Sequence, residues 1–275
     1  MNFSLRSAST LLHYAAIPAL SLAICTFAPL RAQADDRAIL AEDDASQSSY
    51  NDGWKTDSGG GSGFGNWTLR SASKQGAQSH AGFYTATKGQ NPDLQGAAIR
   101  DKSFGLYANG EDYEIATAFR PLKKPLAVGQ TFSFLLEHGR FEKKFENGDP
   151  TGGSIGITLR SGNSSSDCDD YNKHARFEFG CYQGKDTYQI YDGSNKQDTG
   201  VPVTSGGLSI SLTLLTADTY EVEITTLADH KTVTLKDRRF GGDAGTKIES
   251  FCVFDRNSEK YDAYFNGFQI IGEDK

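Results

Sequence analysis

The clearest pattern in this chain is the alternation of apolar and polar residues between Leu208 and Leu227. Apolar side chains occupy every second position over residues 208–214 and again over 220–224. A period of two in residues rich in β-branched and aromatic types predicts two half-buried strands rather than a helix. Leu214 and Tyr220 face the same side only if an odd number of residues connects the strands, so we expect the three-residue loop Thr216–Asp218.

The same alternation recurs along the chain between clusters of Gly, Asn and Asp. Short strands with few helical patterns predict an all-β fold, and consecutive strands joined by turns favour two packed antiparallel sheets. Residues 38–45 fit either a helical turn or a strand followed by a loop. The thirteen strands expected from the pattern lie near residues 66–72, 82–87, 103–108, 113–120, 131–137, 154–160, 175–182, 187–191, 208–215, 219–227, 231–236, 248–254 and 263–271.

Glycines are unusually dense between residues 50 and 67, above all in the run 59–65. Such a segment is either a flexible linker or a tightly wrapped loop, because glycine loses the most entropy on ordering. Linkers rarely carry three large aromatic residues, whereas this segment contains Trp54, Phe64 and Trp67. We therefore expect an ordered loop that packs on the sandwich through these three side chains.

Several motifs resemble those of a known family. They are YNDGW (50–54), GFGNWTL (63–69), FGLYAN (104–109), LAVGQTF (126–132) and YDAYFN (261–266). The chain resembles secreted bacterial proteins with a concanavalin A-like (LamG-like) jelly roll, many of unassigned function. The likeness covers most of the chain after the N-terminal segment, and its motifs are structural. It implies a two-sheet antiparallel β-sandwich of the jelly-roll type.

The first 34 residues are typical of a secretory signal peptide. Arg6 precedes an apolar run, and the small-x-small sequence Ala32–Ala34 follows it. Cleavage after Ala34 leaves residues 35–275, a length compatible with one sandwich domain that includes the Gly-rich loop. An uncleaved membrane anchor is the alternative, although polar residues and Pro18 interrupt the run. No other segment is apolar enough to span a bilayer, so we expect a secreted, periplasmic or cell-surface protein.

The charge balance limits the classes of molecule that the protein can bind. The sequence has 28 Lys and Arg against 35 Asp and Glu, a formal net charge of −7. Cleavage after Ala34 removes Arg6 and Arg31 and no acidic residue, so the mature chain is more acidic still. An acidic chain without a basic cluster is a poor nucleic-acid binder, because phosphate neutralisation needs concentrated positive charge. Anionic lipids or glycans would also be repelled unless a local patch or a cation intervenes.

Three cysteines remain after cleavage. Cys168 and Cys181 bracket a loop that runs into a strand, and in an oxidising compartment they are the natural disulfide pair. Cys252 lies in an apolar strand, where a thiol packs as a small hydrophobic group.

The strongest enzymatic candidate is the strand 176–183, with Tyr182 and Gln183 at its end. It faintly resembles the jelly-roll alginate lyase strand that carries a catalytic tyrosine. Such a lyase also needs a group that neutralises the uronate carboxylate and a second proton-transfer group, and the family's other strand motifs are missing here. The alternative is an ordinary strand whose alternate aromatic residues fill the core.

A glycosidase on this fold needs two carboxylates facing one cleft. Glu221 and Glu223 have the required spacing along one strand, opposite its apolar face. The solvent face of any sandwich strand shows the same pattern, which is the competing interpretation.

Two kinds of ligand site remain. Asp167, Asp169 and Asp170 form an oxygen-rich loop of the sort that binds calcium, or a solvated loop without a ligand. Neutral sugars commonly bind on Trp or Tyr faces surrounded by polar groups, and Trp54, Tyr107 and Tyr182 are candidates for such platforms. Packing in the core or a loop is the alternative for each of them.

The sequence therefore favours a non-catalytic jelly-roll module that binds carbohydrate or packs in an envelope or extracellular matrix. A polysaccharide-active enzyme centred on Tyr182, or on Glu221 and Glu223, is the second hypothesis. A secreted structural protein without a ligand is the third. We expect no cofactor other than calcium.

Overall fold

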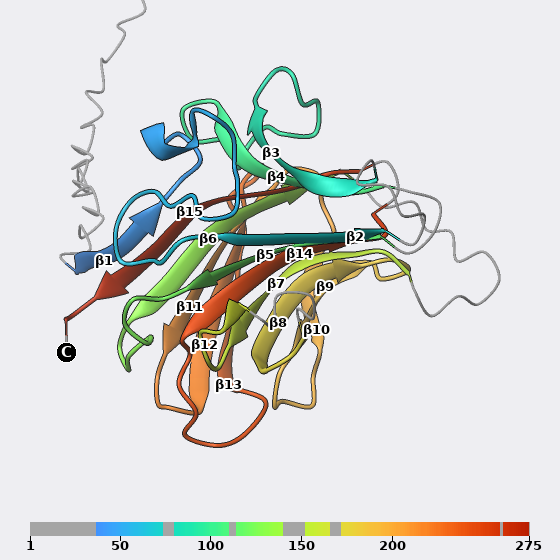
Figure 1. Ribbon diagram of the computed structural model, residues 1–275. Coiled ribbons are helices and arrows are strands. Elements are labelled where there is room, and N and C mark those ends of the chain that lie inside the picture. Colours follow the sequence, from blue (N-terminus) through green and yellow to red (C-terminus); the bar gives the residue numbers. More distant parts are fainter. Residues whose placement is uncertain are drawn as a thin grey trace, which may run out of the picture. The chain divides into compact units, whose positions relative to one another are not determined.

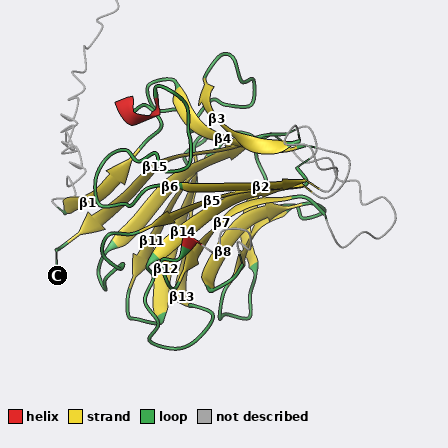
Figure 2. Ribbon diagram, in the orientation of Figure 1, coloured by secondary structure: helices red, strands yellow, loops and turns green. Residues whose placement is uncertain are grey.

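A computed structural model describes residues 37–73, 80–109, 114–139, 152–165, 172–258 and 261–274. Their regular structure is β-strand, apart from short 3₁₀ turns such as η1 (Ser48–Tyr50). Figures 1 and 2 show two antiparallel sheets packed face to face. The predicted all-β, two-sheet sandwich is confirmed. No helix in this part of the chain is long and apolar enough to cross a bilayer, and the expected signal peptide lies outside the described residues.

One sheet has eight strands, all paired antiparallel. In spatial order they are β13 (Thr232–Arg239), β12 (Thr219–Thr226), β11 (Leu208–Leu214), β6 (Thr131–His138), β15 (Ala263–Gly272), β4 (Lys102–Ala108) and β3 (Ala81–Thr87), with β1 (Ala38–Asp43) also paired with β15. Strand β15 pairs with β4 through its first residues and with β1 through its last, so β1 and β4 succeed one another along the same edge of β15.

The other sheet has seven strands, again all antiparallel. In spatial order they are β10 (Asp198–Pro202), β9 (Thr187–Tyr191), β8 (Ala175–Tyr182), β7 (Ser154–Arg160), β14 (Ser250–Arg256), β5 (Glu114–Pro121) and β2 (Thr68–Ser73). In this order β7, β8, β9 and β10 are consecutive in the chain, whereas β14, β5 and β2 come from distant parts of it, as the colours in Figure 1 show.

The strand predictions hold in detail. Each of the thirteen expected strands is present, and residues 38–43 form a strand followed by a loop. Leu214 pairs with Tyr220, and both are buried, as the odd-length loop requires. Strand β10 was not expected, because Asp198–Pro202 is short, polar and interrupted by Gly200.

The main core lies between the sheets. Its centre is a group of aromatic rings in which Phe251 and Phe268 stack at 4.8 Å between centroids, with Trp67 edge-on to Phe251 at 5.5 Å. Phe104 and Phe132 pack against the same group, and none of the five rings is more than 1% exposed. Aromatic side chains bury large apolar areas, so this group dominates the packing energy of the sandwich.

The Gly-rich segment is ordered and packs on the sandwich, as predicted. Trp54, Phe64 and Trp67 are all buried in the main core. The Arg120 guanidinium lies over the Trp67 ring at 4.7 Å and the Phe64 ring at 5.1 Å. It also donates to the backbone carbonyls of Gly65 and Gly60, which fixes both ends of the glycine run.

A buried network of polar side chains also holds this loop against the sandwich. Arg120 forms an ion pair with Asp43, and both side chains are fully buried. The Tyr50 hydroxyl donates to Asp43 and accepts from the Trp67 indole N–H at 3.1 Å and from the Gly60 backbone N–H at 2.8 Å. Because a buried charge is tolerated only when it is paired and hydrogen-bonded, Arg120 and Asp43 hold the loop in one conformation.

Candidate functional site

The outer face of the seven-stranded sheet carries the tyrosine singled out from the sequence. Along β8, Phe177 and Phe179 pack in the core between the sheets. Side chains alternate along a strand, so Glu178, Gly180 and Tyr182 point to the opposite, outer face. Strand β8 therefore presents a carboxyl group and a phenol on the same side, separated by a glycine.

Neighbouring strands add to this surface. Glu178 is paired directly with Tyr191 of β9. Tyr182 is paired with Ser154 of β7, which in turn is paired with Arg256 of β14. Directly opposed residues of paired strands share a face, so all five side chains project from the same side of the sheet.

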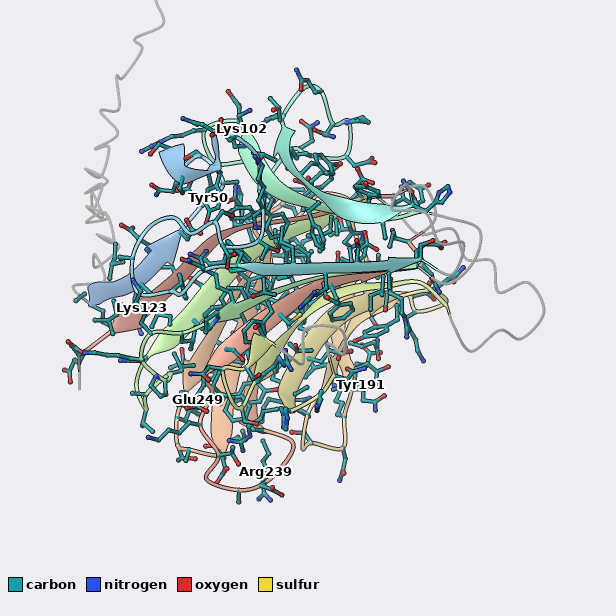
Figure 3. The ribbon with its side chains drawn as sticks, viewed as in Figure 1. Tyr50, Lys102, Lys123, Tyr191, Arg239 and Glu249 are labelled. Carbon is teal, nitrogen blue, oxygen red and sulfur yellow. The ribbon has the colours of Figure 1, made fainter. Side chains whose placement is uncertain are left out.

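Tyr182 contacts both Glu178 and Tyr191, and the three residues are called here the tyrosine–glutamate cluster. The Tyr182 hydroxyl donates a hydrogen bond to Glu178 Oε1. Residues four apart on a strand are separated by about 13 Å, so the two side chains lean together over Gly180, which has no side chain in the way. The Tyr191 ring packs edge-on against the Tyr182 ring, with 5.1 Å between the ring centroids. Tyr191, the last residue of β9, is labelled in Figure 3.

The environment changes the acidity of this carboxyl group. Glu178 is only 6% exposed, and burial raises its pKa to about 7; the Tyr182 hydrogen bond and the Arg256 charge lower it by less. Burial, followed by the charge of Glu178, raises the pKa of Tyr191. The cluster therefore contains a carboxyl group that changes its charge near neutral pH.

Only part of the outer face is open to a ligand. Thr117, Thr158 and Phe254, in the middle of the sheet, are no more than 1% exposed. Tyr182 and Tyr191 are half-buried, so each keeps part of its ring at the surface. Accessible surface remains at the two ends of the sheet, at β2 with the exposed Arg70 and at β8 and β9, where two phenol rings flank a carboxyl group. Such a group of side chains can bind a hydroxyl-rich ligand, and it can also move a proton.

Gln183 follows Tyr182 in the sequence and takes a different role. Its side-chain Oε1 accepts from the Gly153 N–H at 2.9 Å, and its backbone N–H donates to the Gly153 carbonyl at 2.8 Å. Gln183 therefore ties the end of β8 to the chain before β7.

The predicted glycosidase pair lies on the other sheet. Glu221 and Glu223 project from the outer face of β12, where Glu223 is exposed and Glu221 forms an ion pair with Lys236 at 3.4 Å. The structure does not bring them together with Tyr182. Their surroundings match the solvent face of an ordinary strand.

The predicted sugar platforms are not gathered in one place. Trp54 is 3% exposed and packs against Trp67 at 5.1 Å and Phe104 at 4.9 Å. Trp54 therefore packs mainly as a core residue and leaves only a small part of its ring at the surface. Tyr107 lies half-buried on the outer face of β4, over Gly82 of β3.

The structure has Cys181 as a free thiol. It points into the main core, where burial raises its pKa to about 12. This differs from the expected disulfide, because alternation along β8 turns Cys181 into the core between the sheets. Its expected partner, Cys168, lies outside the described residues, as do the calcium candidates Asp167, Asp169 and Asp170. Across the ranges that the structure describes, no group of three or more His, Cys, Asp or Glu side chains is placed to hold a metal ion.

Glu178 and Tyr191 were missed as site residues. The signal for Glu178 was present, since it shares the parity of Tyr182 in the strand 175–182. Tyr191 had no such signal, because its contact with Tyr182 depends on the pairing of β8 with β9, which alternation alone does not specify.

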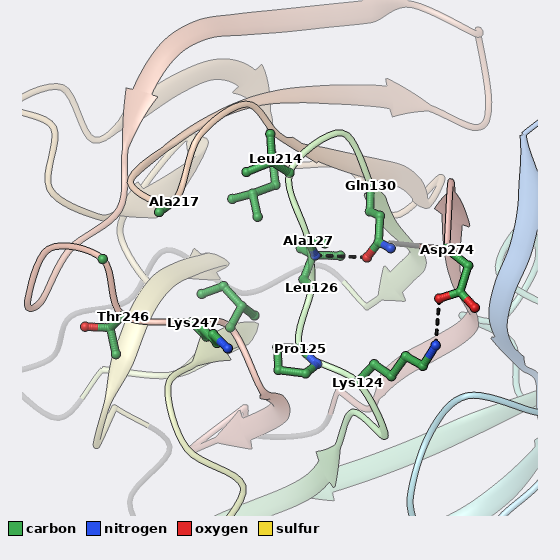
Figure 4. Close-up of a pocket in the computed structure, with 13 residues that line it drawn as sticks. Lys124, Pro125, Leu126, Ala127, Gln130, Leu214, Ala217, Thr246, Lys247 and Asp274 are labelled. Atoms are coloured by element: carbon green, nitrogen blue, oxygen red, sulfur yellow. Dashed lines mark hydrogen bonds and ion pairs between the residues drawn. The ribbon is translucent and has the colours of Figure 1, made fainter.

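A cavity of about 440 Å³ lies at one end of the sandwich (Figure 4). Leu126, Leu214 and Ile248 contribute its apolar wall. Two lysines reach its rim, and Lys124 is neutralised there by Asp274 at 2.7 Å, which leaves the second, Lys247. The mixed lining fits no specific chemistry.

No protein-family model matches the sequence, and no curated protein matches it. Several solved structures share its general arrangement. One, from work on the endo-acting O-glycanases that human gut microbiota express to initiate mucin breakdown, has a TM-score of 0.49 at 11% identity, covering 86% of this chain and 100% of that one.

Two further structures have a similar arrangement. The carbohydrate esterase of a Shiga toxin-encoding bacteriophage has a TM-score of 0.45 at 9% identity, covering 86% of this chain and 100% of that one. The endo-β-1,4-glucuronan lyase of the fungus Trichoderma reesei has a TM-score of 0.43 at 8% identity, covering 75% of this chain and 95% of that one.

Proposed function

We propose that this chain is a non-catalytic carbohydrate-binding module that holds a sugar on the tyrosine–glutamate cluster. The observation that carries the proposal is the half-buried pair Tyr182 and Tyr191 beside the Glu178 carboxyl group. Aromatic faces supply an apolar platform for a sugar ring, and a carboxyl oxygen accepts hydrogen bonds from its hydroxyls. Two tyrosine rings beside a polar group therefore suit the binding of a sugar.

The setting of this activity is part of the proposal. Residues 1–34 have the features of a signal peptide, so we place the mature protein outside the cytoplasm, secreted, periplasmic or at the cell surface. Calcium at Asp167, Asp169 and Asp170 is proposed as an accessory ion, on the strength of their oxygen-rich sequence.

A glycan array tests the proposal. The probe is purified residues 35–275, with and without calcium, beside the double variant Tyr182→Ala, Tyr191→Ala. We expect binding to a defined set of glycans that the double variant loses. No glycan bound by the wild type would favour a structural protein without a ligand. Glycan binding that survives in the double variant would place the site elsewhere.

One observation favours a second candidate, a polysaccharide-active enzyme. A carboxyl group with a pKa of about 7 hydrogen-bonded to a phenol is a competent proton-transfer pair. The half-buried Arg256, whose charge already acts on Glu178, is placed to stabilise an anionic substrate. Ultraviolet absorbance of unsaturated uronate products separates this candidate from a binding module.

A further inference from the structure

A second cavity, of about 690 Å³, opens beside the Gly-rich loop. Its lining comes from residues 45–55 on one side and from β3 and β4, with the turn before β4, on the other. Four aromatic residues, Tyr50, Trp54, Phe83 and Tyr84, belong to its lining, and Phe83 and Tyr84 are the more exposed of them. The volume is in the range of cavities that hold small ligands.

Three cationic side chains line this cavity: Lys55, Arg100 and Lys102. None of the described residues that line it is an aspartate or a glutamate. The whole sequence has a net charge of −7, so this cavity concentrates positive charge in an acidic protein. A concave site lined by one sign of charge raises the local concentration of ions of the opposite sign.

The backbone holds these cations in defined places. Lys102 is the first residue of β4, and its Nζ donates to Thr87 Oγ1 at 2.8 Å. Arg100 and Asp101 form a two-residue turn with φ values of 47° and 63°. Both values are unfavourable for residues with a side chain, and turns of this kind usually contain Asn or Gly. The chain thus tolerates backbone strain to present Arg100 at this edge.

The wall behind the cations is held in place by aromatic packing and by the Arg120 network. The Trp54 ring meets the Phe83 ring edge-on at 5.5 Å, and the Arg120 network fixes the loop on the far side of Tyr50. Trp54 Nε1 and Thr85 Oγ1 are fully buried behind this wall and, within the described residues, have no hydrogen-bond partner. Both belong to residues of the cavity wall. An aromatic surface beside these cations suits a ligand with one apolar face and one negative group.

We propose that this cavity binds a small anionic ligand with an apolar ring face, of the chemical class of the acidic sugars. The carboxylate would meet Lys102 and Arg100, and the ring would lie against the aromatic wall. This site goes beyond the proposed function, because it lies on the eight-stranded sheet, away from the tyrosine–glutamate cluster. Lys102 and Tyr191 are well separated in Figure 3.

Isothermal titration calorimetry on purified residues 35–275 tests this site. The probes are a glucuronic-acid disaccharide, its neutral glucose counterpart and inorganic sulfate. We expect the uronate to bind at least about tenfold more tightly than the neutral disaccharide, since charge-assisted hydrogen bonds are the stronger ones. Lys102→Gln and Arg100→Gln should each weaken uronate binding by about tenfold, and added salt should weaken it further.

The matched control is Lys247→Gln, which removes a lysine from the other cavity and should leave uronate affinity unchanged. Tyr191→Ala should also leave it unchanged, so failure here and failure of the proposed sugar site are distinguishable. Lys55→Gln, at an exposed position, provides a third variant if Arg100→Gln or Lys102→Gln unfolds the turn. Equal affinity for the uronate and the neutral disaccharide, or undiminished binding in the variants, would overturn the assignment. Sulfate binding as tightly as the uronate would exclude the ring contact.

Discussion

Tyr182 donates a hydrogen bond to Glu178 across Gly180 on the outer face of β8. The contact closes a gap of four residues along one strand and holds a phenol against a carboxyl group that is almost fully buried. Burial raises the pKa of Glu178 to about 7. The charge of the tyrosine–glutamate cluster therefore changes within the physiological pH range, which affects stability as well as binding.

The first prediction concerns stability against pH. Glu178 binds its proton more tightly in the folded protein, where its pKa is about 7, than in the unfolded chain, where the ordinary value is 4.5. The stability contribution of a raised carboxyl pKa is fully present below the unfolded pKa and is lost as pH rises through the folded pKa. We expect Glu178 to reduce the free energy of unfolding by about 3 kcal/mol between pH 4.5 and pH 8.

Urea denaturation of the wild type and of Glu178→Gln at pH 5 and pH 8 measures this effect. The difference in unfolding free energy between the two pH values should shrink in the variant, because the amide does not titrate. Glu223→Gln, an exposed carboxyl on the other sheet, is the control and should behave as the wild type does. An equal pH dependence in the wild type and Glu178→Gln would show that the carboxyl is not buried in solution.

The second prediction concerns the buried ion pair. Arg120→Leu leaves Asp43 as an uncompensated buried charge and releases the carbonyls of Gly60 and Gly65. We expect a loss of about 3–5 kcal/mol of unfolding free energy by urea denaturation. Limited proteolysis should then cut the chain rapidly between Gly59 and Gly65.

The control for this variant is Lys124→Ala, which breaks an ion pair whose side chains are 73% and 63% exposed. Exposed pairs contribute about 0–1 kcal/mol, so its stability should be close to that of the wild type. Similar effects of Arg120→Leu and Lys124→Ala would contradict a structural role for the buried pair.

The sandwich was predictable because its signal is local. A period of two marks which side of a strand is buried, and the parity of Leu214 and Tyr220 requires both to face the core, as their pairing does. Strand β10 was missed because its Asp198, Gly200 and Pro202 weaken that alternation. The Gly-rich loop was placed from its aromatic residues, but the anchors Asp43 and Arg120 lie outside the segment and show no local pattern.

The candidate site was less predictable, because contacts between strands depend on which strands pair. Tyr182 was identified from its strand, but its contact with Tyr191 requires β8 to lie beside β9. Trp54 was expected both as a packing residue and as a sugar platform, and composition alone does not separate these roles. Its exposed fraction of 3% and its packing against Trp67 and Phe104 do.

The third prediction concerns Cys181. Its thiol lies in the main core, and burial raises its pKa to about 12, so little thiolate forms at neutral pH. A thiol-labelling reagent should therefore leave Cys181 unmodified in the native protein and modify it in urea, as measured by mass spectrometry of its peptide. Rapid native labelling, or a cross-link from Cys181 in unreduced peptide maps, would contradict the inward position.

The fourth prediction is that purified residues 35–275 show no lyase or glycosidase turnover. Tyr182 and Glu178 are hydrogen-bonded to each other, and Glu221 and Glu223 lie on the other sheet. Catalytic groups act as a unit, so two such groups alone give little rate acceleration. The assays are reducing ends and unsaturated products from alginate, laminarin, agarose and xylan. Turnover abolished by Tyr182→Phe would establish the lyase instead, and turnover abolished by Glu221→Gln or Glu223→Gln would indicate a glycosidase.

The central claim is that a sugar binds on the tyrosine–glutamate cluster, and calorimetric titration of Tyr191→Ala tests it most directly. The ligand is the tightest-binding neutral glycan from the array, and the matched control is Tyr107→Ala, a half-buried tyrosine on the outer face of the other sheet. Losing an aromatic platform should weaken binding by at least about tenfold in Tyr191→Ala, and Tyr107→Ala should bind as the wild type does. Unchanged affinity in Tyr191→Ala, or an equal loss in both variants, would contradict the account.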